Sequence, residues 1–196
     1  MIKELFTHPE FLYPGIFLIS FISNSIPFIG IPYLNFLVVA SPFLRIEEAA
    51  IVAVVSALGA SLGKIVIYFI GAGVRMTLSE RTKENLAFFE KIFEKWGVLA
   101  VFIFAASPLP DDVLYIPLGI ARYKLLHFFP AVFCGKIVVT FLAIFMGKAT
   151  YDSIKFLLGN DILSFAVFFL ITTLLTFAVI RIDWKSVFEK YGMRKK

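Results

Sequence analysis

The sequence has few of the residues that build disulfide frameworks and metal centres. It contains one cysteine, Cys134, and two histidines among 196 residues. A single cysteine excludes an intramolecular disulfide, and no cysteine–histidine cluster suggests a metal or another cofactor. The first residues, MIKELFTHPEF, also lack the apolar core and small-residue cleavage site of a secretory signal, so we expect no cleavable leader.

Charged residues are scarce as well, at 17% of the chain, whereas 60% is hydrophobic and 24 residues are phenylalanine. A soluble domain is roughly half apolar, so this composition, with a mean hydropathy of +0.89, indicates an integral membrane protein. The net charge of +5 is small, and many basic residues lie outside the apolar runs. That distribution favours membrane lipids as partners and argues against nucleic acid.

Five apolar stretches are long enough to cross a bilayer: residues 15–44, 47–73, 98–121, 125–147 and 161–182. Prolines break the first at Pro27 and Pro32 and the third at Pro108 and Pro110. A proline removes a backbone donor and clashes with the preceding turn. Broken backbone is tolerated at membrane depth only where protein or a water-filled cavity surrounds it, so we expect two re-entrant hairpins.

The distribution of basic residues tests this topology, because Lys and Arg concentrate on the cytoplasmic side of membrane proteins. With the C-terminal tail inside and all five stretches crossing, nine lie inside and eight outside. If both broken stretches enter and leave on the same side, thirteen lie inside and four outside. The count favours two re-entrant hairpins and three crossing helices, in a multi-pass plasma-membrane protein with a cytoplasmic C-terminus.

The same topology contains a repeat. The tetrapeptide GKIV occurs twice, around Lys64 and Lys136, and each copy follows a proline-broken stretch. Residues 15–73 and 97–148 each read as a hairpin followed by a crossing helix, the first opening outward and the second inward. Inverted repeats of this kind are typical of transporters, whose site lies at the midplane between broken helices. The predicted fold is therefore an all-α membrane protein built on an inverted repeat, with an extra transmembrane helix over 161–182.

Amphipathic segments complete the expected single membrane domain of residues 1–196. Residues 77–96 open with a capping box formed by Thr77 and Glu80 and place Leu86, Phe89 and Phe93 on one helical face. This pattern predicts an interfacial helix on the cytoplasmic surface. The basic tail, residues 183–196, is expected to lie at an interface in the same way. The sequence leaves a homo-oligomer open.

Four charged residues stand inside these apolar stretches and are the candidate site: Asp111, Asp112, Lys64 and Lys136. A charge at the bilayer centre costs about 3 kcal/mol on insertion scales, and opposite charges lower that cost for each other. Repulsion between the adjacent aspartates is expected to raise the apparent pKa of the pair, which suits a proton relay. The two lysines offer a cationic site for an anion such as a phosphate.

Structural roles remain open for the same residues. Asp111 is a candidate N-cap for a helix starting near Val113, and Asp112 suits the positive end of that helix. Lys64 is close enough to Gly73 to snorkel towards an interface, a role that is less available to Lys136. Arg122 lies near the expected cytoplasmic edge, where positive charge is ordinary.

The pattern resembles the DedA family, also called SNARE-associated or VTT-domain proteins. The resemblance covers residues 15–150 and rests on PFIGIP at 27–32, LGASLGKIVIYFIGAG at 58–73, WGVLAVFIFAASPLP at 96–110 and LGIARYKLLHFFPAVFCGK at 118–136. It implies two re-entrant hairpins and translocation or scrambling of lipids such as polyprenyl phosphate or phospholipid, with proton coupling in bacterial members. Arg122 matches the family's arginine in the last of these segments.

The chain also departs from the better-known bacterial branch of that family. The first hairpin has Ser23, Asn24 and Tyr33 where that branch has acids, Ala105 and Asp111 stand at its second-hairpin arginine positions, and Lys64 replaces an aspartate. An anionic-lipid site can persist, with Lys64, Lys136 and Arg122 as cations and the two aspartates as the titratable pair.

The resulting hypothesis is a lipid transporter without catalytic residues. The alternatives are an ion- or proton-coupled small-solute transporter and a non-transporting membrane scaffold. An intramembrane aspartyl hydrolase is disfavoured, because Asp111 and Asp112 are adjacent in the chain and point in different helical directions.

Overall fold

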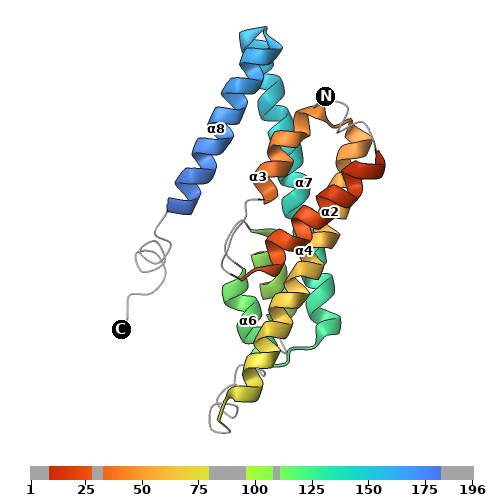
Figure 1. Cartoon of the computed structure of the whole chain (residues 1–196), viewed down its shortest axis with the longest axis vertical. Helices are drawn as coiled ribbons and strands as arrows, with labels where there is room; N and C mark the ends of the chain where they lie inside the picture. The colour runs from red at the N-terminus through yellow and green to blue at the C-terminus, as the bar shows by residue number, and fades with distance from the viewer. Residues whose placement is uncertain (1–8, 28–32, 80–95, 108–110, 182–196) are drawn as a thin grey trace. The chain divides into compact units, whose positions relative to one another are not determined.

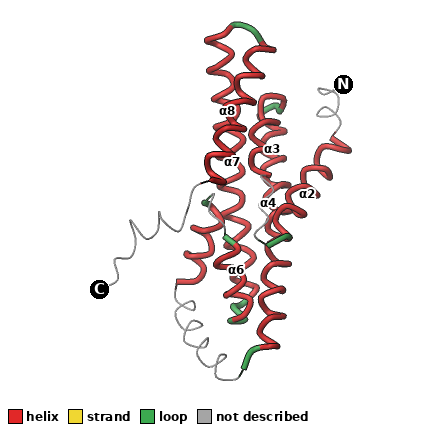
Figure 2. The backbone as a smooth tube through the Cα atoms, turned by 60° about the vertical axis from the view of Figure 1, so that its left-hand side comes forward, coloured by secondary structure: helices red, strands yellow, loops and turns green. Residues whose placement is uncertain are grey.

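The computed structural model describes residues 9–27, 33–79, 96–107 and 111–181, and every regular element in this part of the chain is a helix (Figures 1 and 2). The chain divides into two compact units, Met1–Ala149 (unit 1) and Thr150–Lys196 (unit 2). Pro32, Pro108 and Pro110 lie outside the described residues, as do most of the interfacial helix expected over 77–96 and the basic tail at 183–196.

The first proline-broken stretch consists of two helices, α2 (Pro9–Ser25) and α3 (Tyr33–Ala40), followed by a short 3-10 helix, η1 (Ser41–Phe43). Helix α2 ends at Ser25, just before Pro27, which lies in a turn. The two helices run in opposite directions in both backbone views (Figures 1 and 2). We refer to residues 9–43 as hairpin 1. Helix α2 begins six residues before the apolar stretch predicted from residue 15, because Leu12 is already buried in the core.

The second element is one long helix, α4 (Ile46–Val74), which continues into η2 (Arg75–Thr77). Its start is stabilised by Glu48, whose side chain accepts a hydrogen bond from the backbone N–H of Arg45 at 2.8 Å. Together α4 and η2 form a 32-residue apolar helix with a mean hydropathy of 2.2, longer than the roughly 20 residues that a bilayer requires.

The second proline-broken stretch again contains two helices, Trp96–Ala106 and α6 (Asp112–Ile120). We refer to residues 96–120 as hairpin 2. Helix α6 ends in a Schellman-type turn, in which the backbone N–H of Tyr123 donates to the carbonyl of Leu118 at 3.0 Å. Arg122 occupies the left-handed position of this turn, with φ of 54°, where glycine is the usual residue.

The second long helix, α7 (Leu125–Leu158), has 34 residues and a mean hydropathy of 2.2. Within unit 1 it runs antiparallel to α4 (Figures 1 and 2). It extends well beyond the predicted end at residue 147, because hydropathy marks the apolar part of a helix and not its last turn. In the described part of the chain, α7 and the continuous helix Ile46–Thr77 are the two helices long and apolar enough to span a membrane.

The core of unit 1 has two apolar clusters, one for each hairpin. The first joins hairpin 1 to the N-terminal half of α4 and includes Leu37, Val52 and Ala60, with Ile144 from the C-terminal part of α7. The second joins hairpin 2 to the C-terminal half of α4 and the N-terminal part of α7, and its members are Ile67, Tyr68, Val101, Ala105, Tyr115, Leu118, Tyr123, Phe128, Ala131 and Val132. Each long helix therefore contributes to both clusters.

Unit 2 contains the last turns of α7 and helix α8 (Asp161–Arg181), which corresponds to the helix predicted over 161–182. Helix α7 is followed by Gly159, whose φ of 64° is left-handed. Helix α8 begins with Asn160 as its N-cap, since its Oδ1 accepts the backbone N–H groups of Ile162 at 2.9 Å and Leu163 at 3.1 Å.

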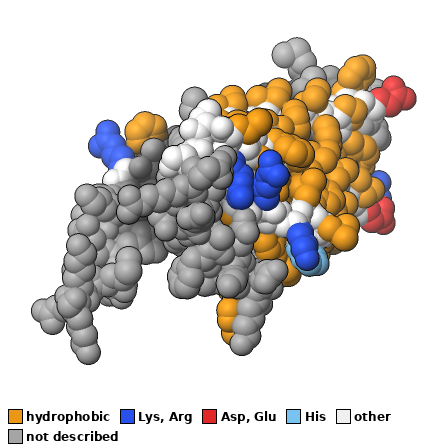
Figure 3. Space-filling model, turned by 90° about the horizontal axis from the view of Figure 1, so that it is seen from below, with side chains coloured by type: hydrophobic (Ala, Val, Ile, Leu, Met, Phe, Trp, Pro, Cys, Tyr) orange, Lys and Arg blue, Asp and Glu red, His pale blue; other side chains and the backbone are white. Residues whose placement is uncertain are grey.

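The described surface is largely apolar. Large side chains such as Phe69, Leu142 and Leu174 are more than half exposed, and Figure 3 shows apolar side chains across much of one face, with a small group of Lys and Arg side chains. Such an extensive apolar surface is far larger than a soluble monomer presents to water and is what a lipid environment requires.

Candidate functional site

Four charged side chains from three helices meet inside unit 1. The Lys64 ammonium lies 2.7 Å from Asp112 Oδ1 and 2.9 Å from Asp111 Oδ1, and the Lys136 ammonium lies 2.6 Å from Asp111 Oδ2. All four are buried, with exposed fractions of 4–7%. We call this group the quartet. The structure thus brings together the four charged residues that the sequence singled out within its apolar stretches.

The quartet lies between the two apolar clusters of the core. On α4, Lys64 separates Ala60 of the first cluster from Ile67 of the second. On α7, Lys136 separates Val132 of the second cluster from Ile144 of the first. Asp111 and Asp112 stand where α6 begins. The charges are therefore held at the junction of the two halves of unit 1, near the middle of the helix Ile46–Thr77 and about a third of the way along α7.

The quartet is electrically balanced, with two ammonium groups facing two carboxylates. Burial of separate charges costs several kcal/mol each, and only close pairing with good geometry offsets that cost. Asp111 is the central member, because each of its oxygens accepts from a different lysine. It consequently links the start of hairpin 2 to both long helices, and loss of either lysine leaves buried negative charge with too few partners.

The structure shows neither the capping role expected for Asp111 nor the snorkelling expected for Lys64. Asp111 occupies the N-cap position of α6, yet its side chain makes no capping hydrogen bond, and both of its oxygens bind lysines instead. Lys64 does not snorkel to an interface, since its ammonium group is buried against Asp111 and Asp112. Asp112 does lie in the first turn of α6, where negative charge suits the helix dipole.

The structure does not bring Arg122 into the quartet. Its side chain is exposed in the turn between α6 and α7, beyond Tyr123, whose carbonyl accepts a hydrogen bond from the Tyr68 hydroxyl at 2.7 Å. A role for Arg122 in binding stays a prediction.

Of the prolines expected to break the hairpins, Pro27 lies in the turn after α2.

Two buried tyrosine hydroxyls adjoin the quartet. Tyr33 already stood out in the sequence, whereas Tyr115 did not. The Lys136 ammonium lies 6.0 Å from the ring centroid of Tyr33, and Tyr115 stands one helical turn after Asp111. Within the described residues, neither hydroxyl has a hydrogen-bond partner. An unsatisfied buried hydroxyl costs about 1–3 kcal/mol. Tyr115 escaped notice because an aromatic residue in an apolar run ordinarily packs in a core.

Glycines beside the two lysines allow the hairpins to approach the long helices. A Cβ added at Gly63 would lie 2.6 Å from the carbonyl oxygen of Phe21 in α2, the first arm of hairpin 1. A Cβ added at Gly135 would lie 2.7 Å from the carbonyl oxygen of Phe102, in the first arm of hairpin 2. The two Gly-Lys pairs thus have equivalent surroundings, each next to the first arm of the hairpin that precedes it in the chain.

A second pair of contacts follows the same arrangement. Arg75, about three turns after Lys64, donates from Nη1 to the carbonyl of Ile120 at the end of hairpin 2, at 2.8 Å. Lys148, about three turns after Lys136, donates to the carbonyl of Leu44, just after hairpin 1, at 2.7 Å. Each long helix therefore uses a basic residue, about three turns after its buried lysine, to bond a carbonyl at the end of one hairpin.

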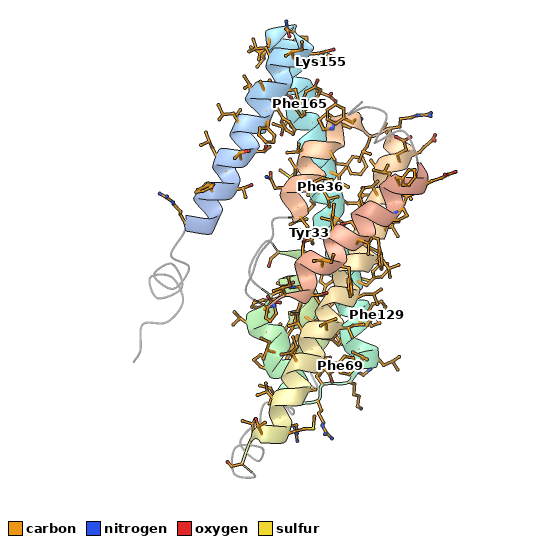
Figure 4. All side chains as sticks on the ribbon, in the orientation of Figure 1. Tyr33, Phe36, Phe69, Phe129, Lys155 and Phe165 are labelled. Carbon is orange, nitrogen blue, oxygen red and sulfur yellow. The ribbon has the colours of Figure 1, made fainter. Side chains whose placement is uncertain are left out.

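The chemistry of the site is ionic. Among the described residues, no group of three or more His, Cys, Asp or Glu side chains is arranged to hold a metal ion. Figure 4 shows Tyr33 at the first turn of α3, the end of that helix that points towards the middle of unit 1. The site thus combines two cations, two anions and two free hydroxyls in an apolar surrounding.

Two long apolar helices, two broken helical hairpins and a buried charge cluster define the class of a helical membrane protein with an internal polar site. Comparison with protein families identifies it further: the family model of the VTT domain matches residues 28–149. The chain therefore belongs to the VTT-domain family, the DedA or SNARE-associated family, whose members are membrane-associated. Comparison with curated proteins and with solved structures gives no match.

Proposed function

We propose that this protein moves an anionic lipid, a polyprenyl phosphate or a phospholipid, across the plasma membrane. The observation that carries the proposal is the quartet, a buried ionic site at the junction of the two halves of unit 1. Ionisable groups buried in a membrane segment generally mark a substrate or ion pathway. Membership of a family regarded as transporter- or flippase-like supports the same reading.

The membrane topology belongs to this proposal. Hairpins 1 and 2 enter the bilayer from opposite sides, α4 and α7 cross it, and α8 crosses again to leave the C-terminus in the cytoplasm. The opposite course of the corresponding helices supports an inverted repeat (Figures 1 and 2). The matched surroundings of Gly63 and Gly135, and of Arg75 and Lys148, support it further. In such repeats the substrate site lies near the midplane.

Transport requires the headgroup to exchange places with a carboxylate. In the arrangement described above, without a bound headgroup, Asp111 and Asp112 neutralise both lysines. A phosphate that reaches the quartet replaces Asp111 as the partner of Lys136 and Lys64, because phosphate offers more acceptor oxygens than a carboxylate. Release on the other side restores the ion pairs. The cycle needs hairpin 2 to move relative to the long helices, since Asp111 joins them.

Proton coupling follows from the same exchange. An Asp111 carboxylate that has lost both ammonium partners is an unpaired buried charge, which is strongly unfavourable. Uptake of a proton removes that charge while the headgroup is bound, and return of the lysines expels it. The proposal therefore links one proton to each exchange of headgroup and carboxylate. In this proposal Arg122, which is exposed just after hairpin 2, attracts headgroups at the cytoplasmic surface.

The test is lipid flipping in reconstituted liposomes. Purified full-length protein is inserted into vesicles that contain NBD-phosphatidylglycerol, and dithionite then measures the rate at which inner-leaflet lipid becomes accessible. Asp111→Asn and Lys136→Met are each expected to slow flipping by about tenfold or more. Lys136→Met removes a charge-assisted contact to the headgroup worth roughly 1.5–3 kcal/mol, and Asp111→Asn removes the ion pairs of similar strength that displace the headgroup on release. Lys155→Met, which breaks an exposed pair with Asp161 in unit 2, is the matched control.

The alternatives give different outcomes in the same vesicles. A small-solute transporter takes up solute under an ion gradient without flipping lipid. A scaffold does neither, and Lys64 substitutions then harm assembly alone. Flipping by Asp111→Asn and Lys136→Met at the wild-type rate would remove the quartet from the mechanism.

A further inference from the structure

The two tyrosine hydroxyls beside the quartet have no role in the ion pairs just described. Tyr33 is 8% exposed and Tyr115 is fully buried. Neither hydroxyl has a hydrogen-bond partner in the part of the chain that the structure describes. Other buried hydroxyls nearby are satisfied: Thr140 donates to the carbonyl of Lys136 at 2.7 Å, and Ser20 and Ser56 bond each other at 2.7 Å. Among the buried side chains that the structure describes, the two tyrosines are thus exceptions to the satisfaction of polar groups.

Both hydroxyls belong electrostatically to the quartet. Tyr33 interacts with Lys136 and Asp111, whereas Tyr115 interacts with Asp111, Asp112 and Tyr33. The rings themselves are fixed by packing. Tyr115 makes an edge contact with Phe128 at 5.1 Å between centroids, and Lys136 lies over the Tyr33 ring at 6.0 Å. The hydroxyls are therefore held close to the charged groups, near enough to interact with Asp111 and Lys136 but without a well-formed hydrogen bond to them.

The two tyrosines come from opposite hairpins. Tyr33 is the first residue of α3, the second arm of hairpin 1, and Tyr115 is in α6, the second arm of hairpin 2. A group bound by both hydroxyls consequently touches both hairpins at once. Lysine carries three N–H donors, and among the described contacts Lys136 gives one of them to Asp111. Potential donors from both hairpins and from α7 thus lie near Asp111.

We propose that Tyr33 and Tyr115 complete the anion site by donating hydrogen bonds to a phosphate group held against Lys136. A hydroxyl donates to an anion and has no charge of its own, so the pair adds affinity without disturbing the balance of the quartet. Several donors converging from different helices suit the several oxygens of a phosphate better than the two of a carboxylate. This inference rests on the proposed function, because it names the residues that recognise the headgroup.

The test is a binding measurement on the purified full-length protein in detergent. The probes are dihexanoyl phosphatidic acid, dihexanoylglycerol, which lacks the phosphate, and inorganic phosphate. Isothermal titration calorimetry gives Kd, and thermal unfolding without ligand gives Tm. Tyr33→Phe and Tyr115→Phe are each expected to weaken phosphatidic acid binding about tenfold, as loss of a hydrogen bond to a charged group does.

The stability measurement separates recognition from structure. Removing an unsatisfied buried hydroxyl is neutral or stabilising, so Tm of both variants is expected to stay unchanged or to rise. Tyr68→Phe is the matched control, because the Tyr68 hydroxyl donates to the carbonyl of Tyr123 at 2.7 Å. That variant is expected to lower Tm and to leave Kd unchanged.

Unchanged Kd in both tyrosine variants would mean that water satisfies the hydroxyls, and would overturn this proposal. So would a fall in Tm like that of Tyr68→Phe, or no binding of either phosphate probe to the wild type. Equal affinity for inorganic phosphate and phosphatidic acid would keep the tyrosines in the site and count against lipid as the substrate. Wild-type flipping with unchanged Kd in both variants would retain the transport proposal and reject this inference alone.

Discussion

At the scale of single residues, Asp111 is the central member of the quartet. Its two oxygens bind lysines from two different long helices, and its neighbour Asp112 shares one of them. A buried pair stabilises little in net terms, but the loss of one partner is costly because the other charge remains buried. The quartet therefore makes a prediction about stability that is independent of transport.

Lys64→Met is expected to lower the free energy of unfolding by roughly 3–5 kcal/mol, measured by SDS titration in mixed micelles. Adding Asp112→Asn is expected to recover part of the loss, because the unpaired carboxylate is removed. Lys155→Met serves as the control: its ammonium is half exposed beside Asp161, and no measurable change is expected. A Lys64→Met variant as stable as Lys155→Met would show that the quartet is not a buried ionic network.

Substitution of Arg122 by glycine is expected to stabilise the protein. With φ of 54°, Arg122 occupies a left-handed position that disfavours every residue with a Cβ except Asn and Asp. Arg122→Gly is expected to raise the free energy of unfolding by about 0.5–1 kcal/mol, whereas Arg122→Ala, which keeps the Cβ, gains nothing. Equal stability of the Gly and Ala variants would mean that backbone strain is not relieved at this turn.

At the scale of elements, close helix contacts set the position of the hairpins. Hairpin 2 lies against α7 at Gly135, where an added Cβ would come within 2.5 Å of the Ala105 Cβ. Gly73 near the end of α4 has nothing within 4 Å of such an atom. A glycine-to-alanine substitution therefore tests helix contact at Gly135 and helix propensity at Gly73.

Gly135→Ala is expected to destabilise the protein by roughly 1–3 kcal/mol, because the first arm of hairpin 2 must shift. Gly73→Ala is expected to stabilise it by up to about 1 kcal/mol through helix propensity. Thermal unfolding in detergent measures both. If Gly135→Ala is as stable as Gly73→Ala, the first arm of hairpin 2 does not pack as tightly against α7 as described.

At the scale of the whole molecule, the position of Thr77 distinguishes two topologies. Two re-entrant hairpins and five crossing segments place this residue on opposite sides of the membrane. Single cysteines are placed in a Cys134→Ser background and labelled with a membrane-impermeant maleimide in sealed vesicles of known orientation. Thr77→Cys is expected on the cytoplasmic side, together with Lys124→Cys and opposite to Asp152→Cys. All three positions are exposed. Labelling of Thr77→Cys on the same side as Asp152→Cys would support five crossings instead.

The sequence located the helices and the charges but not their contacts. The prolines correctly placed breaks in the first and third apolar stretches, and the family resemblance is confirmed by the match to residues 28–149. Periodicity and hydropathy cannot tell which helices share a charge, so the sharing of Asp111 between Lys64 and Lys136 required the fold. Tyr115 could not be found at all, because a missing hydrogen bond is a property of tertiary structure.

The most direct test of the account is native mass spectrometry of the protein extracted from its membrane with its bound lipids. The wild type is expected to carry an anionic phosphate-containing lipid, and Lys64→Met with Lys136→Met is expected to lose it. Lys148→Met is the control, because Lys148 lies about three turns after Lys136 and its ammonium donates to the carbonyl of Leu44, outside the quartet. An anionic lipid retained equally by the double variant, or a wild type that carries only neutral lipid, would contradict the assignment of the quartet as the headgroup site.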